Sequence, residues 1–276
     1  MNTITDKKQL SEFVYQMRIL APLIAEERLP GQFIILQVSD DGERIPLTIA
    51  DADITSGTVT VIFQVVGKTT TCLSLLKIGD QVAHIVGPLG MPTHIEKFGH
   101  VICVGGGIGI APLYPIAQGM KQAGNKLTVI LGARQKDLII LENEMKKIAD
   151  ELIVCTDDGS YGRKALVTEP LKALCENSPN PNMVVAIGPA IMMKFCAETT
   201  RPFKIPTMVS LNSIMIDGTG MCGGCRVSVG QKTKFVCVDG PEFDGHQVDF
   251  DNLIKRLSAY KKTEQEAWHK CRLEKL

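Results

Sequence analysis

The stretch Asp217-Gly218-Thr219-Gly220-Met221-Cys222-Gly223-Gly224-Cys225, followed by Cys237, contains the most specific pattern in this 276-residue chain. Its spacing, D-x4-C-x2-C-x11-C, differs in one letter from the C-x4-C-x2-C…C spacing of plant-type iron–sulfur sites. Thiolates are the soft donors that such clusters require. The glycines allow positive φ angles, so the backbone can wrap an inorganic core and point N–H groups at its sulfides. The pattern predicts a [2Fe-2S] cluster held by Asp217, Cys222, Cys225 and Cys237.

A structural zinc is the alternative for the same residues, with three cysteines and His246 as ligands. Structural zinc sites are usually built from two close ligand pairs, and Cys237 has no near partner in the sequence. Asp217 stands where the first cysteine of the plant-type spacing would stand, and its carboxylate is a harder donor than a thiolate. The spacing favours the cluster, with Asp217 as an unusual ligand.

The totals limit the class of protein. The length suggests two domains and leaves room for a small third, and the net charge is zero from 30 basic and 30 acidic side chains. This balance favours neither nucleic acid nor an anionic membrane as a partner. No apolar run resembles a signal peptide or a membrane span, so we expect a cytoplasmic protein without membrane attachment. The nine cysteines then indicate metal ligation and buried thiols, with plain packing expected for Cys72, Cys103, Cys155, Cys175, Cys196 and Cys271.

Residues 1–97 are predicted to form a small antiparallel β-barrel. Short apolar runs separated by turn clusters predict strands over 13–20, 33–38, 58–66 and 81–87, and only 69–77 has a helical pattern. Arg44, Pro46 and Thr48 alternate along one face of an extended segment. Gly67 precedes the hydroxyls of Thr69 and Thr70 at a helix start, where N–H groups can bind a pyrophosphate. Either segment alone is also typical of an ordinary strand end or helix start.

Residues 98–205 are predicted to form an α/β domain with a parallel sheet. The buried strand 100–104 runs into Gly105–Pro112, and a helical segment follows over 113–123. Strand, glycine-rich turn and helix form the context in which glycines bind nucleotide phosphate, although G-x-G-x-x-G itself is absent. Three further strands, 126–131, 151–156 and 183–187, also end in small or polar clusters. Open α/β sheets bind ligands at that edge, although four ordinary tight turns would give the same pattern.

The remaining chain is predicted to comprise a cluster region over 206–248 and a helical tail over 249–276. Phe250, Leu253, Ile254 and Leu257 have helical spacing, and a charged stretch with the only tryptophan, Trp268, follows. The tail is expected either to pack on its own domain or to dock a partner subunit.

A barrel, a nucleotide-binding α/β domain and a cluster loop together resemble the ferredoxin–NADP reductase superfamily. The chain is most similar to the branch with a C-terminal cluster, which includes the electron-transfer subunits of dihydroorotate dehydrogenase. The likeness covers nearly the whole chain and rests on Arg44-x-Pro46-x-Thr48, Gly67-Lys68-Thr69-Thr70, Gly105–Pro112, Gly188-Pro189-x-x-Met192 and the cluster loop through Pro241. The dihydroorotate branch has a cysteine at the position of Asp217. Aspartate there resembles the small subunits of NADH-dependent reduced ferredoxin:NADP oxidoreductases, also known as sulfide dehydrogenase beta subunits.

The resemblance implies an electron-transfer flavoprotein with FAD, a [2Fe-2S] cluster and NAD(H), with NADP(H) as the alternative nucleotide. The residues implied for FAD are Arg44, Pro46, Leu47, Thr48, Val66, Gly67, Thr69 and Thr70. Those implied for the nicotinamide dinucleotide are Gly105, Gly106, Gly107, Gly109, Pro112, Gly132, Ala133, Arg134, Asp157, Asp158, Gly188, Pro189 and Met192. The family also implies a larger partner subunit with a second flavin and further clusters, in a heterodimer that performs flavin-based electron bifurcation and meets ferredoxin through the complex.

The cofactors suggest a division of labour that needs no catalytic acid or base. A nicotinamide exchanges two electrons as hydride and a two-iron cluster takes one, so a flavin has to stand between them. Alternatives are the electron-transfer subunit of a dihydroorotate dehydrogenase or sulfhydrogenase complex, and a zinc-stabilised adaptor that has lost its flavin. The adaptor is disfavoured because three cofactor motifs would have to persist without use.

Overall fold

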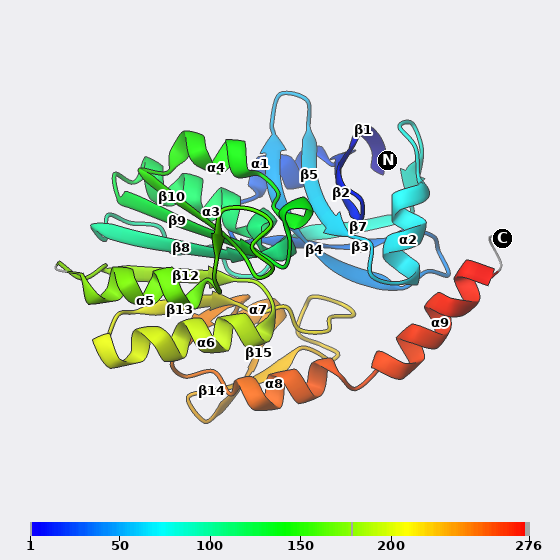
Figure 1. Ribbon diagram of the computed structural model, residues 1–276. Coiled ribbons are helices and arrows are strands. Elements are labelled where there is room, and N and C mark those ends of the chain that lie inside the picture. Colours follow the sequence, from blue (N-terminus) through cyan, green and yellow to red (C-terminus); the bar gives the residue numbers. More distant parts are fainter. Residues whose placement is uncertain (1, 178, 274–276) are drawn as a thin grey trace.

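A computed structural model describes residues 2–177 and 179–273, so residues 274–276 of the predicted tail lie outside the description, as does the side chain of Cys271. Within these residues the strands form two seven-stranded sheets and one two-stranded hairpin (Figure 1). The first sheet is formed by the N-terminal part of the chain, and the second by the middle together with residues 207–210 and 242–244. The predicted combination of an antiparallel barrel, a parallel α/β sheet and a C-terminal cluster region is confirmed.

The first sheet is an antiparallel, nearly closed barrel with the order β6-β1-β2-β5-β4-β3-β7. Its interior is filled by alternate side chains of neighbouring strands, among them Ile34, Leu36 and Phe63. Its strands are β1 (Asn2–Ser11), β2 (Val14–Leu20), β3 (Phe33–Gln37), β4 (Arg44–Asp53), β5 (Thr58–Gln64), β6 (Gln81–Val82) and β7 (His84–Leu89), with helices α1 (Pro22–Glu27) and α2 (Lys68–Leu75).

The predicted strands and the helix near Thr69 are confirmed, but two elements were not foreseen. Strand β1 is charged, and Ile4 is its only fully buried residue, so its sequence lacks the apolar alternation that predicts a strand. Helix α1 has six residues, which is too short to show helical periodicity.

The second sheet has the order β11-β10-β9-β8-β12-β13-β16, and its strands are parallel except for β16 at one edge. Helices α3 and α4 cover one face, while α5 and α6 cover the other (Figure 1). The strands are β8 (His100–Gly106), β9 (Lys126–Ala133), β10 (Glu151–Thr156), β11 (Arg163–Lys164), β12 (Met183–Ile187), β13 (Thr207–Ser210) and β16 (Glu242–Asp244). The helices are α3 (Ile110–Gln122), α4 (Glu142–Ile148), α5 (Thr168–Glu176) and α6 (Ala190–Thr200), with short 3-10 turns at Gly107–Gly109, Lys136–Leu138 and Arg201–Phe203.

The C-terminal part begins with the cluster loop and continues into a hairpin and three helices, β14 (Arg226–Val229), β15 (Lys232–Phe235), α7 (Val236–Asp239), α8 (Phe250–Leu257) and α9 (Lys261–Leu273). Phe250 and Leu253 of α8 are buried in the core that includes α6, which confirms packing on its own domain for this half of the tail. Helix α9 leads away from the α/β domain and lies beside α2 of the barrel (Figure 1). Cys103, Cys155, Cys175 and Cys196 are buried core residues, as predicted.

Two hydrophobic cores join the barrel to the rest of the molecule. Phe33 and Ile35 of β3 belong to the same core as Cys225, Cys237 and β16 residue Phe243. A second core joins Val14, Ala50 and Ile62 of the barrel to α3. The barrel, the α/β sheet and the cluster loop are therefore held together by buried apolar contacts.

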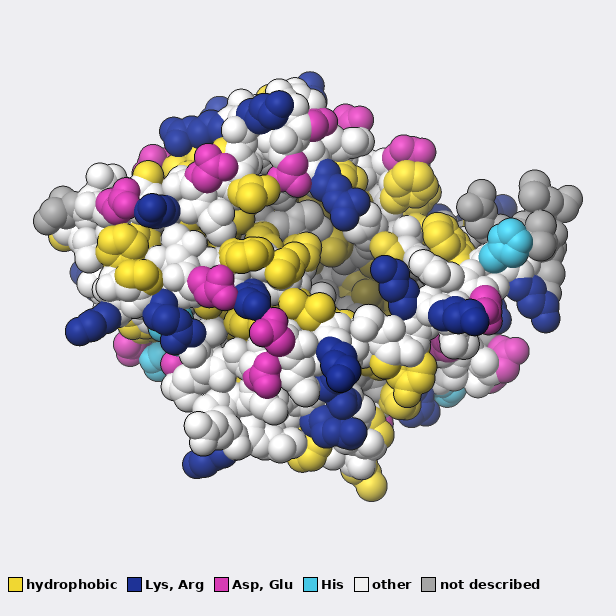
Figure 2. Space-filling view, turned by 60° about the horizontal axis from the view of Figure 1, so that its bottom comes forward, with side chains coloured by type: hydrophobic (Ala, Val, Ile, Leu, Met, Phe, Trp, Pro, Cys, Tyr) yellow, Lys and Arg dark blue, Asp and Glu magenta, His cyan; other side chains and the backbone are white. Residues whose placement is uncertain are grey.

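The charges on the surface reflect the equal numbers of acidic and basic residues. Figure 2 shows basic and acidic side chains interspersed on one face, with hydrophobic side chains bordering a hollow near its centre. Among the described residues, no helix is both long enough and apolar enough to cross a membrane.

A carboxyl group lies where β16 meets the barrel. Glu242 Oε1 accepts a hydrogen bond of 2.5 Å from the hydroxyl of Thr93, and a side chain at Gly31 would contact both residues. Burial raises the pKa of Glu242 from 4.5 to about 7. The folded chain therefore holds a proton on Glu242 at pH values where the unfolded chain has lost it.

We predict that this proton makes stability fall as pH rises from about 4.5 to about 7, because unfolding then releases it. The wild-type chain should lose on the order of 2–3 kcal/mol of unfolding free energy relative to Glu242→Gln across this window. Denaturant titrations at pH 5 and pH 8 measure the difference, with Glu12→Gln as an exposed control. A difference between wild type and Glu242→Gln that stays constant with pH would contradict the assignment.

Candidate cofactor sites

The predicted flavin strand is β4, and its residues divide between two faces. Pro46 lies opposite Ile35, and Thr48 lies opposite Phe33, on the outer side of the barrel. Arg44 shares this face, as the alternation predicted, and is exposed. Leu47 packs instead with the barrel interior, so only its backbone can face a cofactor bound outside.

The second predicted flavin segment forms the start of α2. The hydroxyl of Thr70 accepts hydrogen bonds from the N–H groups of Val66, at 3.0 Å, and Gly67, at 3.1 Å. This cap shapes the first turn, whose next N–H groups have no partner within the helix and can receive an anion. Thr69, also in this turn, donates a 2.7 Å hydrogen bond to Glu43, the residue before Arg44. This hydrogen bond joins the two predicted FAD segments. Glu43 itself was not predicted from the sequence.

The predicted nucleotide residues lie at the carboxyl ends of neighbouring parallel strands. In the sheet register Gly106 lies opposite Gly132, Thr156 opposite Ala133 and Ile187 opposite Gly105. The register confirms that the small and polar clusters share one edge of the sheet.

The glycines at this edge are required by close packing. A Cβ at Gly109 would lie 2.5 Å from the carbonyl oxygen of Ile187, and a Cβ at Gly106 would collide with the sulfur of Met192. Gly188 also contacts Met192, which lies in the first turn of α6. The turns after β8 and β12 therefore lie against each other, as a dinucleotide-binding crevice at that edge requires. Gly107 has a φ of +55°, and Pro112 follows in the first turn of α3.

Charged side chains border the same edge. Arg134, Asp157 and Asp158 are exposed, and the N–H of Asp158 donates a 3.2 Å bond to the carbonyl of Arg134. Hydrogen bonds from Ser160 lower the pKa of Asp158, so its carboxylate is charged at neutral pH. A guanidinium and two carboxylates at strand ends can bind the ribose and phosphate groups of a dinucleotide.

Asp217 is folded into its own loop. Its carboxylate accepts hydrogen bonds from the N–H groups of Thr219, at 3.0 Å, and Cys222, at 2.8 Å. The backbone hydrogen bond from Thr219 is the main cause that lowers the pKa of Asp217. The side chain is therefore a charged oxygen donor five residues from the first cysteine of the spacing.

The three predicted cysteine ligands lie around this loop. The sulfurs of Cys225 and Cys237 are 3.2 Å apart and buried, whereas Cys222 is exposed. The N–H of Gly224 points at the sulfur of Cys222 at 3.4 Å, and that of Cys237 points at Cys225 at 3.5 Å. Sulfurs that receive backbone N–H groups fit the donor set of an iron–sulfur cluster.

The complete set of four ligands stays a prediction. In the part of the chain that the structure describes, no three His, Cys, Asp or Glu side chains are grouped so that they could hold a metal ion. His246, the fourth ligand of the zinc alternative, has Nε2 engaged at 2.9 Å with the hydroxyl of Thr200.

The cluster loop packs directly on the barrel. Gly218 has a φ of +75°, and a Cβ there would lie 2.7 Å from side-chain atoms of Ile35 and Leu89. Ile35 is the strand partner of Pro46. The predicted cluster site and the predicted flavin strand are therefore separated by a single strand.

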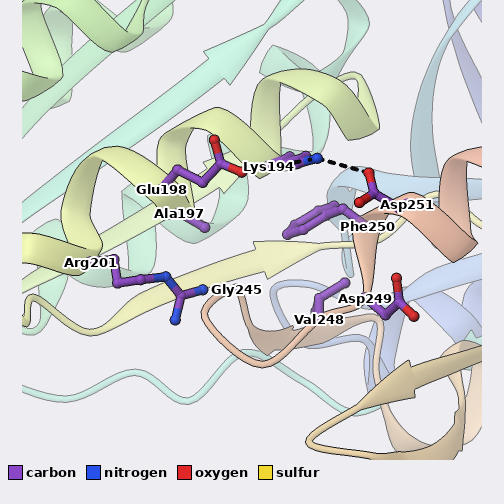
Figure 3. Close-up of a pocket in the computed structure, with 9 residues that line it drawn as sticks. All are labelled: Lys194, Ala197, Glu198, Arg201, Gly245, Val248, Asp249, Phe250 and Asp251. Carbon is purple, nitrogen blue, oxygen red and sulfur yellow. Dashed lines mark hydrogen bonds and ion pairs between the residues drawn. The ribbon is translucent and has the colours of Figure 1, made fainter.

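A pocket of about 140 Å³ lies between α6 and residues 245–251, which include the start of α8. Figure 3 shows its lining residues, with Lys194 paired to Asp251 at 2.8 Å. None of the residues predicted to bind a cofactor lines this pocket.

Two domain families match the chain. Residues 103–198 match the oxidoreductase NAD-binding domain, and residues 212–249 match the iron-sulfur cluster binding domain of dihydroorotate dehydrogenase B. The first match covers the glycine-rich edge of the second sheet, and the second covers Asp217 and the three cysteines. The cofactors predicted from the motifs, NAD(H), FAD and a [2Fe-2S] cluster, agree with these domains and with the reductase fold.

Relatives match over nearly the full length. A Thermotoga maritima homologue of the dihydroorotate dehydrogenase B (NAD(+)) electron transfer subunit is 50% identical, over 96% of this chain and 93% of its own. The corresponding subunit of Fusobacterium nucleatum is 32% identical, over 90% of this chain and 98% of its own length. A chain of the solved NADH-dependent reduced ferredoxin-NADP oxidoreductase is 48% identical with a TM-score of 0.92, over 98% and 97% of the two chains. The chain belongs to the family of dihydroorotate dehydrogenase B electron transfer subunits and their homologues.

Proposed function

We propose that this chain passes electrons between NAD(H), FAD and a [2Fe-2S] cluster as one subunit of a heterodimeric ferredoxin:NAD(P) oxidoreductase. The observation that supports this most directly is the packing of Gly218 on Ile35, the strand partner of Pro46. A cluster loop resting on the strand next to the flavin segment suits electron transfer, which needs a short and fixed separation.

FAD held by these residues would supply the change from two-electron hydride chemistry to one-electron transfer. The chain positions the reactants. The outer face of β4 would orient the flavin ring through Pro46 and Thr48, and the first turn of α2 would bind the pyrophosphate. The glycine-lined edge would admit the dinucleotide backbone beside Gly107, where nothing lies within 4 Å of the position of a Cβ. No side chain has to act as an acid or base.

We propose NAD(H) as the nucleotide of this subunit. Asp157 and Asp158 lie at the end of β10, where a carboxylate can bind a ribose hydroxyl and would repel a 2′-phosphate. Arg134 at the end of β9 supports the alternative, NADP(H), because a guanidinium can pair with that phosphate.

The proposed partner is a larger subunit with a second flavin and further clusters, through which ferredoxin is reached. Beside the cluster ligands, Ile216 and Met221 of the loop and Val238 of α7 are 55%, 88% and 40% exposed, so a partner could cover apolar surface there. The name of the similar solved oxidoreductase supports such a complex. A second candidate is the electron-transfer subunit of a dihydroorotate dehydrogenase, which the names of the curated relatives support. The partner that co-purifies from the native source distinguishes the two.

We predict that the anaerobically purified chain shows flavin absorbance and, after reduction with dithionite, a rhombic two-iron EPR signal. Cys237→Ala should reduce the EPR signal at least about tenfold because a ligand is lost, while flavin content is retained. Cys196→Ala is the matched control, since both cysteines are buried and Cys196 lies in α6. Bound zinc without an EPR signal would remove the cluster from the proposal.

We also predict that Gly218→Ala lowers both the iron content and the stability of the chain. The added Cβ would meet Ile35 and Leu89 in a backbone conformation with positive φ, at a cost of about 2 kcal/mol or more. Gly79→Ala is the control, because Gly79 also has a positive φ, +95°, but nothing lies within 4 Å of the position of its Cβ. Iron per chain and the unfolding midpoint are the measurements. Equal values for the two variants would show that the loop does not depend on this contact.

A further inference from the structure

Lys7 reaches from β1 to the carboxyl end of α2. Its ammonium nitrogen donates hydrogen bonds to the carbonyl oxygens of Ser74, at 2.5 Å, and Leu76, at 2.7 Å. The same nitrogen lies 5.3 Å from the ring centroid of Tyr15, on the neighbouring strand β2. These contacts join residues that are 67 and 69 positions apart in the sequence, and both are partly buried.

Helix α2 contacts both the barrel and α9. The helix has eight residues, and Leu73 is its one fully buried side chain. The last carbonyl groups of a helix have no partner within it, and a cation there also interacts favourably with the helix dipole. Lys7 supplies both a hydrogen-bond donor and the matching charge. In Figure 1, α2 stands beside the N-terminal strands and away from the α/β domain, so Lys7 attaches its carboxyl end to the barrel while α9 packs beside it.

The opposite end of α2 is the proposed pyrophosphate site. An eight-residue helix is about 12 Å long, so a tilt at one end displaces the N–H groups at the other. The cap formed by Thr70 and Gly67 keeps the first turn in shape, but it does not attach the helix to the barrel. The carboxylate of Glu43 accepts a hydrogen bond from the hydroxyl of Thr69 in this turn. A bound pyrophosphate would compete with that carboxylate for the donors of the first turn.

We infer that Lys7 is a positioning residue for FAD: it fixes the carboxyl end of α2 and thereby aims the N–H groups of the first turn at the pyrophosphate. The inference rests on the proposed function, because it takes FAD as the ligand of that turn. Lys7 touches neither the proposed ring site on β4 nor the cluster loop.

The test compares Lys7→Met, Lys7→Arg and the control Lys8→Met in the full chain. Lys8 is exposed and lies next to Lys7 on β1, where it pairs with Gln16 of β2. The dissociation constant of FAD is measured by flavin fluorescence on the deflavinated chain. The dissociation constant of NADH and the EPR signal of the reduced cluster are measured for the same variants.

We expect Lys7→Met to weaken FAD binding about tenfold, because two charge-assisted hydrogen bonds are lost. Lys7→Arg, which keeps a cationic donor, should stay within about threefold of wild type, and Lys8→Met should be unchanged. NADH affinity and the cluster signal should be the same in all variants.

Two results would overturn the inference while the proposed function stands. One is wild-type FAD affinity in Lys7→Met. The other is an equal loss of FAD binding, NADH binding and cluster signal in that variant, which a purely structural role for Lys7 would produce. Absence of FAD binding by the wild-type chain would instead overturn the proposed function, and the inference with it.

Discussion

The burial of Phe33 and Ile35 in one hydrophobic core with Cys225 and Cys237 holds the barrel against the cluster loop. Both β3 residues point outward from the barrel, so the strand contributes Ile34 and Leu36 to the barrel interior and the other two to the junction. The relative position of the two sites is therefore set by apolar packing. Such packing is nearly incompressible, which suits a protein that has to keep redox groups at a fixed separation.

Polar groups at the edges of these cores have more specific tasks. The side chain of Glu242 accepts a hydrogen bond from Thr93 where β16 meets the barrel, and Lys7 holds the end of a helix in which Leu73 is the fully buried side chain. A buried carboxyl without a cation is costly in its charged form, and an unanchored helix end leaves carbonyl groups unsatisfied. The two residues tie together elements that are far apart in the sequence, the first at the junction of the domains and the second beside a proposed binding site.

Much of the fold and most of the candidate sites follow from local sequence pattern. The turn after β8 was predictable because a buried strand leads into glycines and a helix, and close contacts require two of those glycines. Strand alternation predicted that Arg44, Pro46 and Thr48 share one face. The side chain of Leu47 packs with the barrel interior, so a sequence motif does not distinguish residues that bind through their side chains from those that bind through their backbone. Strand β1, strand β16, Glu43 and Lys7 could not be foreseen, because their roles depend on tertiary pairing that leaves no local signal.

In the proposed function, electrons move through this chain from NADH to the flavin and on to the cluster. An anaerobic titration of the purified, oxidised chain with NADH, followed in one sample by absorbance and EPR spectroscopy, tests it most directly. NADH should bleach the flavin absorbance, and the two-iron EPR signal should develop as the flavin is reduced. If NADH leaves the flavin oxidised, or reduces it without any cluster signal, the proposed route is contradicted.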